Sequence, residues 1–205
     1  MRNNERKIMN FLVNKIVCAI GCVAKDNNSK LNAKHIAFAA MALALAVATS
    51  MIKVIKLPMG GSVTLFSMLF IVLIGYWYGI KTGLTAALAY GVLQLLLDPY
   101  ILNIPQVLLD YILGFGALGL SGIFSNSKHG LIKGYIVGVI GRFICSFLSG
   151  WIFFAVYTPE FFNSAILYSI VYNGSYIGLE AAVTLVVISL PPVNKALAYV
   201  KNNLV

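Results

Sequence analysis

The chain has 205 residues, of which 60% are hydrophobic and 10% are charged, and its mean hydropathy is +0.89. This composition excludes an ordinary soluble domain, and apolar runs of about 20 residues that recur along the chain are typical of a multi-pass helical membrane protein. The net charge of +9 does not indicate a nucleic-acid partner, because the basic residues lie in the breaks between the apolar runs.

Residues 1–34 form a strongly basic segment whose apolar side chains fall roughly on one helical face. We predict a cytoplasmic, amphipathic arm that lies on the anionic headgroups of the lipid bilayer. The alternative is a short additional span over residues 11–24, which Lys15 interrupts.

Residues 35–192 are predicted to form one all-α domain of six transmembrane helices, and residues 193–205 a cytoplasmic C-terminal tail. The six prolines lie at or beyond the ends of the apolar runs, which fits uninterrupted helices. The predicted helices cover residues 36–52, 63–78, 82–97, 105–124, 131–157 and 165–190.

The distribution of lysine and arginine orients these helices. Twelve of the 15 basic residues lie in segments on the same side as the N-terminus, whereas the opposite side holds only Lys53 and Lys56. Short loops rich in basic residues stay on the cytoplasmic side of a membrane. We therefore predict a multi-pass protein of the plasma membrane with both termini in the cytoplasm.

The first predicted helix contains a stripe of small residues. Ala40, Ala44 and Ala48 are spaced by four, so they share one helical face. Such a stripe permits close helix contact in lipid. The contact is either packing within the chain or docking to a second membrane protein, and the spacing alone does not separate the two.

Two charges lie within the fifth and sixth predicted helices at matching depth. Arg142 and Glu180 are each about 15 Å from the cytoplasmic end of their helix, at 1.5 Å per residue. We predict a buried ion pair between them that fixes helix packing, with a contact to substrate as the less favoured alternative.

Asp110 is the single charge of the fourth predicted helix and lies about two turns from its proline-marked start. No basic residue is predicted at its level, so it is protonated, faces a wet cavity, or has a ligand as its counter-charge. Aromatic side chains beside a carboxylate at one depth form a cage for an organic cation or a flat heteroaromatic ring. The aromatic residues predicted at the depth of Asp110, together with the amide residue Asn173, are Tyr100, Tyr111, Trp151, Phe153, Phe154, Tyr157, Tyr168 and Tyr172.

Nothing in the sequence indicates an enzyme, a metal site or a cofactor. His35 and His129 have no ligand partner, and the cysteines Cys18, Cys22 and Cys145 lack the paired spacing of a zinc site. The chain contains no HExxH and no nucleotide-binding GxxxxGK[ST] motif.

Four separated blocks carry a resemblance to a known family, and they follow each other as LPMGGSVT, LLDYILGFGALGLSGIF, GRFICSFLSGWIFFAVYTPE and YSIVYNGSY. Together they resemble the thiamine-specific substrate-binding (S) component of energy-coupling-factor (ECF) transporters, over residues 33–190. The resemblance implies a six-helix protein that captures thiamine with high affinity at the outer face. It also implies association with a transmembrane coupling protein and two ATPase subunits.

The resemblance assigns roles to individual residues of this chain. Asp110 matches the acidic residue that faces the thiazolium cation, and Ala40, Ala44 and Ala48 match the docking face of the first helix. The other matches are to ring-stacking positions (Tyr111 and Tyr100), pyrimidine contacts (Tyr168 and Asn173), a glycine lining the pocket (Gly150) and a lid loop (Pro58, Gly60, Gly61 and Ser62).

Two positions depart from the family pattern. Ser146 stands where the family usually has histidine, and Phe154 where it often has tryptophan, for which Trp151 one turn earlier can compensate. Thiamine stays the expected ligand, with a related pyrimidine, a thiazolium or an altered affinity as the alternatives.

Two other functions are compatible with the residues. One is a stand-alone secondary transporter for an organic cation, driven by protons, with Asp110 as the coupling group. The other is a purely structural membrane protein in which Asp110 is protonated and inert. The first predicts uptake without ATPases, and the second predicts no ligand at all.

Overall fold

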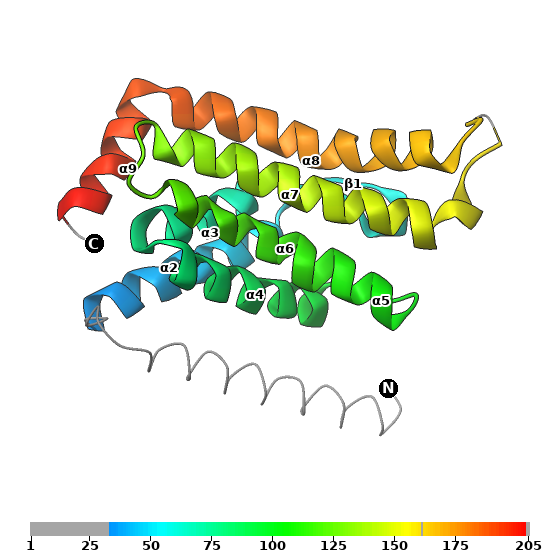
Figure 1. The fold of residues 1–205 in the computed structure, drawn as a ribbon, viewed down its shortest axis with the longest axis horizontal. Coiled ribbons are helices and arrows are strands. Elements are labelled where there is room, and N and C mark those ends of the chain that lie inside the picture. Colours follow the sequence, from blue (N-terminus) through cyan, green and yellow to red (C-terminus); the bar gives the residue numbers. More distant parts are fainter. Residues whose placement is uncertain (1–32, 161, 204–205) are drawn as a thin grey trace, which may run out of the picture.

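The computed structural model describes residues 33–160 and 162–203, which form a bundle of helices (Figure 1). The predicted basic arm lies outside the described residues, except for residues 33 and 34, which begin the first helix. In chain order the longer helices are α2 (Ala33–Ser50), α3 (Ser67–Tyr78), α4 (Ile80–Leu97), the helical segment Ile104–Phe124, α7 (Gly130–Phe153), α8 (Ala165–Ser189) and α9 (Pro191–Asn203).

Four of these elements are long and apolar enough to cross a membrane, namely α4, Ile104–Phe124, α7 and α8. The helices α2 and α3 are apolar but shorter. The protein is thus a mostly helical membrane protein, and each of the six predicted segments overlaps one of these elements. The prediction of an all-α fold is incomplete, because two strands precede α3.

The two strands form an antiparallel hairpin, β1 (Lys53–Lys56) and β2 (Ser62–Thr64), in which Lys56 pairs with Ser62. They are joined by η1 (Pro58–Gly60), one turn of 3-10 helix. Gly60 has a φ of +90°, a conformation that favours glycine. The second predicted helix therefore begins at Ser67 and not at residue 63, because β-branched residues before it pair as a strand.

The fourth segment is continuous but is not the regular helix that we predicted. It begins as α5 (Ile104–Val107), passes through one π-helical stretch, η2 (Leu108–Leu113), and then α6 (Gly114–Gly116), and ends as a 3-10 helix, η3 (Ala117–Phe124). Irregular turns of this kind are frequent at functional sites. The π-helical stretch contains Asp110 and Tyr111.

Glycines bring this segment close to α4. A Cβ atom added at Gly122 would lie 2.4 Å from the backbone of Ile80, and one at Gly119 would lie 2.6 Å from that of Leu84. Only glycine permits this approach, so these two glycines serve packing within the chain.

The core lies around α3, whose residues Ile71, Val72 and Ile74 are fully buried. One face of α2 packs against it through Ala42 and Ala46. The small-residue stripe is on the other face: Ala40, Ala44 and Ala48 are exposed. Packing within the described part of the chain is therefore not the role of this stripe.

Figure 1 shows α7 and α8 side by side, with their connection at one end of the bundle and α9 at the other. Helix α7 ends at Phe153, four residues earlier than predicted, and η4 (Ala155–Tyr157) follows as a 3-10 turn. The predicted C-terminal tail is mostly the helix α9. Lys201 on α9 donates a hydrogen bond to the carbonyl of Ser125, and its Nζ lies 4.0 Å from the ring centroid of Tyr76. Burial there lowers the pKa of Lys201.

Candidate ligand-binding site

A cavity opens at the end of the bundle where α7 and α8 are connected, and its empty space is about 1010 Å³ including the open mouth. The hairpin, the loop after α4, the π-helical stretch, α7 and α8 all contribute to its walls. The predicted site residues that line it are Tyr100, Asp110, Tyr111, Ser146, Gly150, Phe154, Tyr168 and Asn173, with Gly60, Gly61 and Ser62 of the predicted lid.

Asp110 lines the cavity and is hydrogen-bonded to the protein through one of its two carboxylate oxygens. Its Oδ2 accepts hydrogen bonds from Gln106 Nε2 and from Ser149 Oγ, both at 2.7 Å. Its Oδ1 accepts none from the described residues, and no lysine or arginine nitrogen among them lies within 4.0 Å of the carboxylate. The carboxylate is held in place and keeps one oxygen for a ligand.

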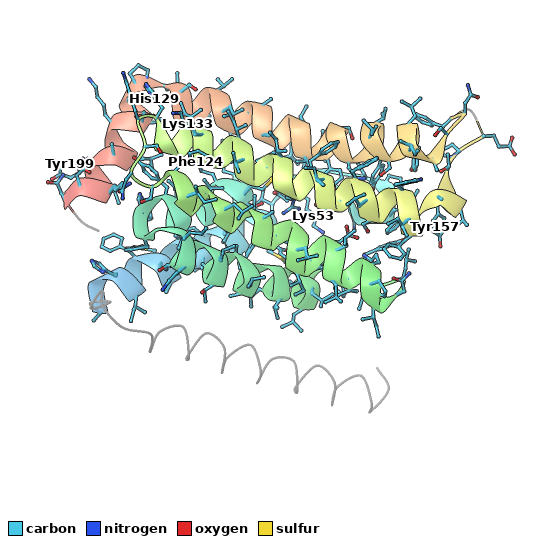
Figure 2. All side chains as sticks on the ribbon, viewed as in Figure 1. Lys53, Phe124, His129, Lys133, Tyr157 and Tyr199 are labelled. Atoms are coloured by element: carbon cyan, nitrogen blue, oxygen red, sulfur yellow. The ribbon has the colours of Figure 1, made fainter. Side chains whose placement is uncertain are left out.

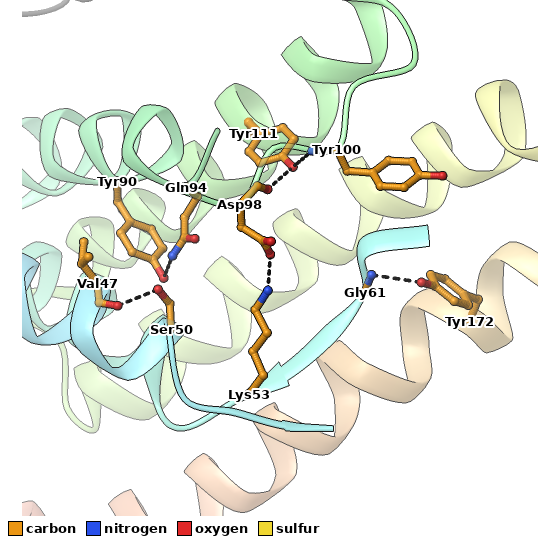
Figure 3. A network of polar contacts seen from close by, with 10 residues as sticks. All are labelled: Val47, Ser50, Lys53, Gly61, Tyr90, Gln94, Asp98, Tyr100, Tyr111 and Tyr172. Atoms are coloured by element: carbon orange, nitrogen blue, oxygen red, sulfur yellow. Dashed lines mark hydrogen bonds and ion pairs between the residues drawn. The ribbon is translucent and has the colours of Figure 1, made fainter. Parts of the chain in front are cut away.

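Two rings from different elements are stacked at the mouth. Tyr100 and Phe154 have centroids 5.7 Å apart and planes inclined by 27°. Tyr111 lines the cavity, and its hydroxyl group donates to the carbonyl of Asp98 and accepts from the backbone N–H of Tyr100, both at 2.9 Å (Figure 3). The hydroxyl group of Tyr111 thereby positions the loop that carries Tyr100.

Helix α8 contributes a column of polar and aromatic groups. Tyr168, Tyr172 and Tyr176 lie one turn apart with successive centroid distances of 5.8 Å. The side chain of Asn173 is buried; its Oδ1 accepts from the hydroxyl group of Tyr176 at 2.9 Å, and its Nδ2 donates to the carbonyl of Ser169 at 3.0 Å. This wall can stack on a flat ring and offers an amide at its edge.

Gly150 sets the distance between α7 and α8. A Cβ atom at this position would lie 2.3 Å from Ser169 Oγ and 2.9 Å from Asn173 Nδ2. The absence of a side chain at residue 150 is therefore needed for the observed approach of the two helices beside the cavity.

The hairpin covers one side of the cavity and is tied to both walls. The hydroxyl group of Tyr172 donates to the carbonyl of Pro58 and accepts from the backbone N–H of Gly61 at 3.0 Å. Lys53 forms an ion pair with Asp98 (Figure 3). Pro58 itself does not line the cavity, although its carbonyl group holds the turn.

The predicted ion pair between Arg142 and Glu180 is wrong. Glu180 Oε2 accepts hydrogen bonds from Thr64 at the end of β2, and Oε1 accepts from Ser67 and Met68 at the start of α3. The guanidinium group of Arg142 lies instead 3.8 Å from the ring centroid of Phe115. Equal distance from the helix ends fixes the depth of the two residues but not the rotation of each helix about its axis. Two residues at one depth on neighbouring helices can face different elements.

The predicted place of Trp151 in the pocket is also wrong. Its side chain is 43% exposed and stacks on Phe147, with centroids 6.3 Å apart, outside the cavity. Trp151 follows Gly150 directly, so it is turned by about 100° away from the cavity wall. Phe154, four residues after Gly150, shares the cavity face instead.

Sequence reasoning missed several polar residues that line the cavity. Gln106 precedes Asp110 by four residues, and Ser169 precedes Asn173 by four, so helical periodicity could have found them. Ser149 comes from another helix, and no local signal pairs it with Asp110. Tyr172 was in the predicted aromatic group, but its tie to the hairpin depends on the tertiary fold.

These features define a multi-pass helical membrane protein with a ligand cavity at one end of its bundle, covered on one side by a hairpin. A family model described as "Thiamine transporter protein (Thia_YuaJ)" matches residues 36–199. The chain therefore belongs to the thiamine transporter protein family, a family of transporters and not of enzymes.

A curated relative and a solved structure agree with this assignment. "Thiamine transporter ThiT" of Bacillus subtilis (strain 168) is 32% identical over 136 residues, which cover 60% of this chain and 70% of the relative. A solved structure of ThiT from Listeria monocytogenes is similar with a TM-score of 0.58 and 24% identity, over 78% of this chain and 93% of that one. The latter likeness concerns the fold alone.

Proposed function

We propose that this chain captures thiamine at the outer face of the membrane for ATP-driven uptake, as the S component of an ECF transporter. The observation that carries the proposal is the carboxylate of Asp110, which keeps Oδ1 for a ligand in a cavity walled by aromatic rings. Thiamine combines a permanent thiazolium cation with a flat aminopyrimidine ring. Charge neutralisation and ring stacking both suit it.

We assign the two halves of thiamine to the two walls of the cavity. Asp110 faces the thiazolium cation, and Tyr100 with Phe154 provides the stacked rings at the mouth. Tyr168 and Asn173 on α8 meet the pyrimidine. Ser146 and Gly150 line α7 between the two halves, and Ser146 offers a single hydroxyl group where the related family usually has an imidazole.

We further propose six membrane crossings with both termini in the cytoplasm and the cavity facing outward. Figure 2 places His129, Lys133 and Tyr199 at the end of the bundle opposite to Tyr157. The end with Tyr157 is the end with the cavity mouth, so the basic residues of the 125–133 connection lie away from it. The basic segment 1–34 then lies on the cytoplasmic surface.

The partners follow from the same proposal. A transmembrane coupling protein docks on the exposed stripe of Ala40, Ala44 and Ala48, because small residues let two helix backbones approach in lipid. Two ATPase subunits supply the energy. The hairpin with Pro58, Gly60, Gly61 and Ser62 acts as the lid over the bound vitamin.

The competing function is a stand-alone, proton-coupled transporter of thiamine or a related cation. The two are separated by uptake into vesicles that contain this chain with and without the coupling protein and ATPases. Uptake by the chain alone that requires a proton gradient favours the competitor. Uptake that requires ATP and all the partners favours the ECF assignment.

The test of the site is isothermal titration of thiamine into the purified full chain. Asp110→Asn keeps the shape and removes the charge, and we expect it to weaken binding by at least about 30-fold. Glu160→Gln is the matched control, because it removes an exposed acid from the α7–α8 connection and should leave the affinity unchanged. Calorimetry is preferred to tryptophan fluorescence because Trp151 lies outside the cavity. Equal affinities of the wild type and Asp110→Asn would contradict the proposal.

A further inference from the structure

Arg142 lies in the middle of α7 and lines the same cavity as Asp110, but it forms no ion pair with the described residues. Its Nε and Nη1 atoms are buried and make no hydrogen bond to the described part of the chain. No carboxylate oxygen there lies within 4.0 Å of its guanidinium group. An unpaired cation at this depth is costly and marks a site by default.

The carboxylates of the described bundle form no ion pair with Arg142. Asp98 also lines the cavity and pairs with Lys53. Glu180 accepts four hydrogen bonds from the end of β2 and the start of α3. Asp110 accepts from Ser149, which is seven residues beyond Arg142 on the same helix. Seven residues correspond to about 10 Å along a helix axis. Asp110 and Arg142 therefore line the same cavity, and the serine that binds Asp110 lies about two helical turns from Arg142.

The guanidinium group lies against an aromatic ring. Its central carbon is 3.8 Å from the ring centroid of Phe115, a cation–π contact. Ser146 lies one turn further along α7 and also lines the cavity. A guanidinium group together with a hydroxyl group is a donor set that binds anions.

We propose that the inner end of this cavity is an anion subsite, in which Arg142 and Ser146 bind a small monovalent anion such as chloride together with the cation at Asp110. The proposal rests on the proposed function insofar as that cation is thiamine. When thiamine neutralises Asp110, Arg142 keeps one uncompensated positive charge in the same cavity. An anion at Arg142 restores neutrality, so anion and vitamin strengthen each other's binding.

The test compares thiamine affinity in sodium chloride and in sodium gluconate of equal ionic strength, because gluconate is a much larger anion than chloride. We expect affinity to be about tenfold higher in chloride, the scale of the attraction between two opposite charges in one protein cavity. Arg142→Gln should lose this chloride dependence, and Arg142→Lys should keep part of it. Lys133→Gln removes an exposed positive charge from the same helix and should keep all of it.

A crystal grown in bromide gives a second, direct measurement that does not depend on how well Arg142→Gln folds. We expect an anomalous peak at about 3.3 Å from the guanidinium nitrogens in the presence of thiamine. Equal affinity in the two salts, chloride dependence that persists in Arg142→Gln, or the lack of this peak overturns the proposal and leaves Arg142 solvated by water alone. Thiamine binding in gluconate tests the proposed function separately, so the two failures are distinguishable.

Discussion

The bundle contains two carboxylates in contrasting surroundings, Glu180 where α8 meets the hairpin and Asp110 at the cavity. Glu180 is 5% exposed, and its two oxygens accept from Thr64 N and Oγ1, Ser67 Oγ and Met68 N. Asp110 accepts two hydrogen bonds, both on Oδ2, and lines the cavity. Hydrogen bonds from the protein thus occupy both oxygens of Glu180 but only one oxygen of Asp110.

The difference teaches how to separate a structural charge from a binding charge. A buried carboxylate whose acceptor positions are occupied by the protein has nothing left to offer a ligand. Glu180 instead fixes β2 and the N-terminus of α3 to α8, and the positive end of the α3 dipole favours it there. The β1–β2 hairpin is therefore attached to α8 through Glu180, while Oδ1 of Asp110 accepts no hydrogen bond from the described residues.

We expect the largest effect on stability when the Glu180 carboxylate is removed. Glu180→Ala leaves four hydrogen-bond donors without their acceptor, each in a buried or half-buried position. We expect the free energy of unfolding to fall by about 3 kcal/mol or more. The measurement is the thermal unfolding midpoint of the full chain in detergent.

Asp110→Asn is the counterpart of this change, and the comparison predicts opposite outcomes. It should lower thiamine affinity while changing the unfolding midpoint little, because the asparagine still accepts from Gln106 or Ser149. Glu180→Gln, which keeps one acceptor oxygen, should fall between wild type and Glu180→Ala in stability. A stable Glu180→Ala variant that had lost thiamine binding would invert the assignment of the two residues.

Much of the fold and of the site could be predicted because the membrane restricts the choices. Apolar runs of about 20 residues can only be helices in lipid. Charges inside such runs are rare, so Asp110, Arg142 and Glu180 stood out as the residues to explain. Asp110 does line a cavity with Tyr100 and Phe154, as the cluster of charge and rings at one depth predicted.

The features that could not be predicted depend on rotation about helix axes and on irregular backbone. Depth along a helix placed Arg142 and Glu180 at one level but did not say which neighbours they face. The π-helical stretch around Asp110 and the hairpin before Ser67 have no strong periodic signal. Trp151 and Phe154 differ by three residues, and only the orientation of α7 decides which of them lines the cavity.

The close approach of α7 and α8 beside the cavity allows a further test of the site that contains Asp110. Gly150→Ala puts a methyl group 2.3 Å from Ser169 Oγ, so α7 and α8 must separate or Ser169 must move. We expect this overpacking to cost about 2 kcal/mol of stability and to weaken thiamine binding by about tenfold or more. Titration calorimetry and thermal unfolding measure the two losses. Gly174→Ala is the control, because its added Cβ meets only Phe143 at 3.7 Å and both quantities should stay near wild type.

The smallest and most discriminating test compares two serine hydroxyl groups that differ in the carboxylate they serve. Ser149 Oγ donates to Asp110 at 2.7 Å, and Ser67 Oγ donates to Glu180 at 3.2 Å. Both serines are buried and both line the cavity, so position alone does not distinguish them. Ser149→Ala and Ser67→Ala each remove one hydrogen bond to a charged acceptor, worth about 1.5 kcal/mol.

The two variants should lose this energy in different measurements. Ser149→Ala should weaken thiamine binding by about tenfold, because it removes a hydrogen bond that stabilises the ionised form of Asp110, the form that attracts the thiamine cation. The free energy of unfolding should change little, because water or a proton can reach Asp110 from the cavity and replace the lost bond. Ser67→Ala should lower stability by about 1 kcal/mol and leave the affinity unchanged, because the contact of Glu180 with the hairpin offers no replacement donor. If both variants lost affinity equally, the two carboxylates would belong to one site, and Glu180 would itself take part in binding.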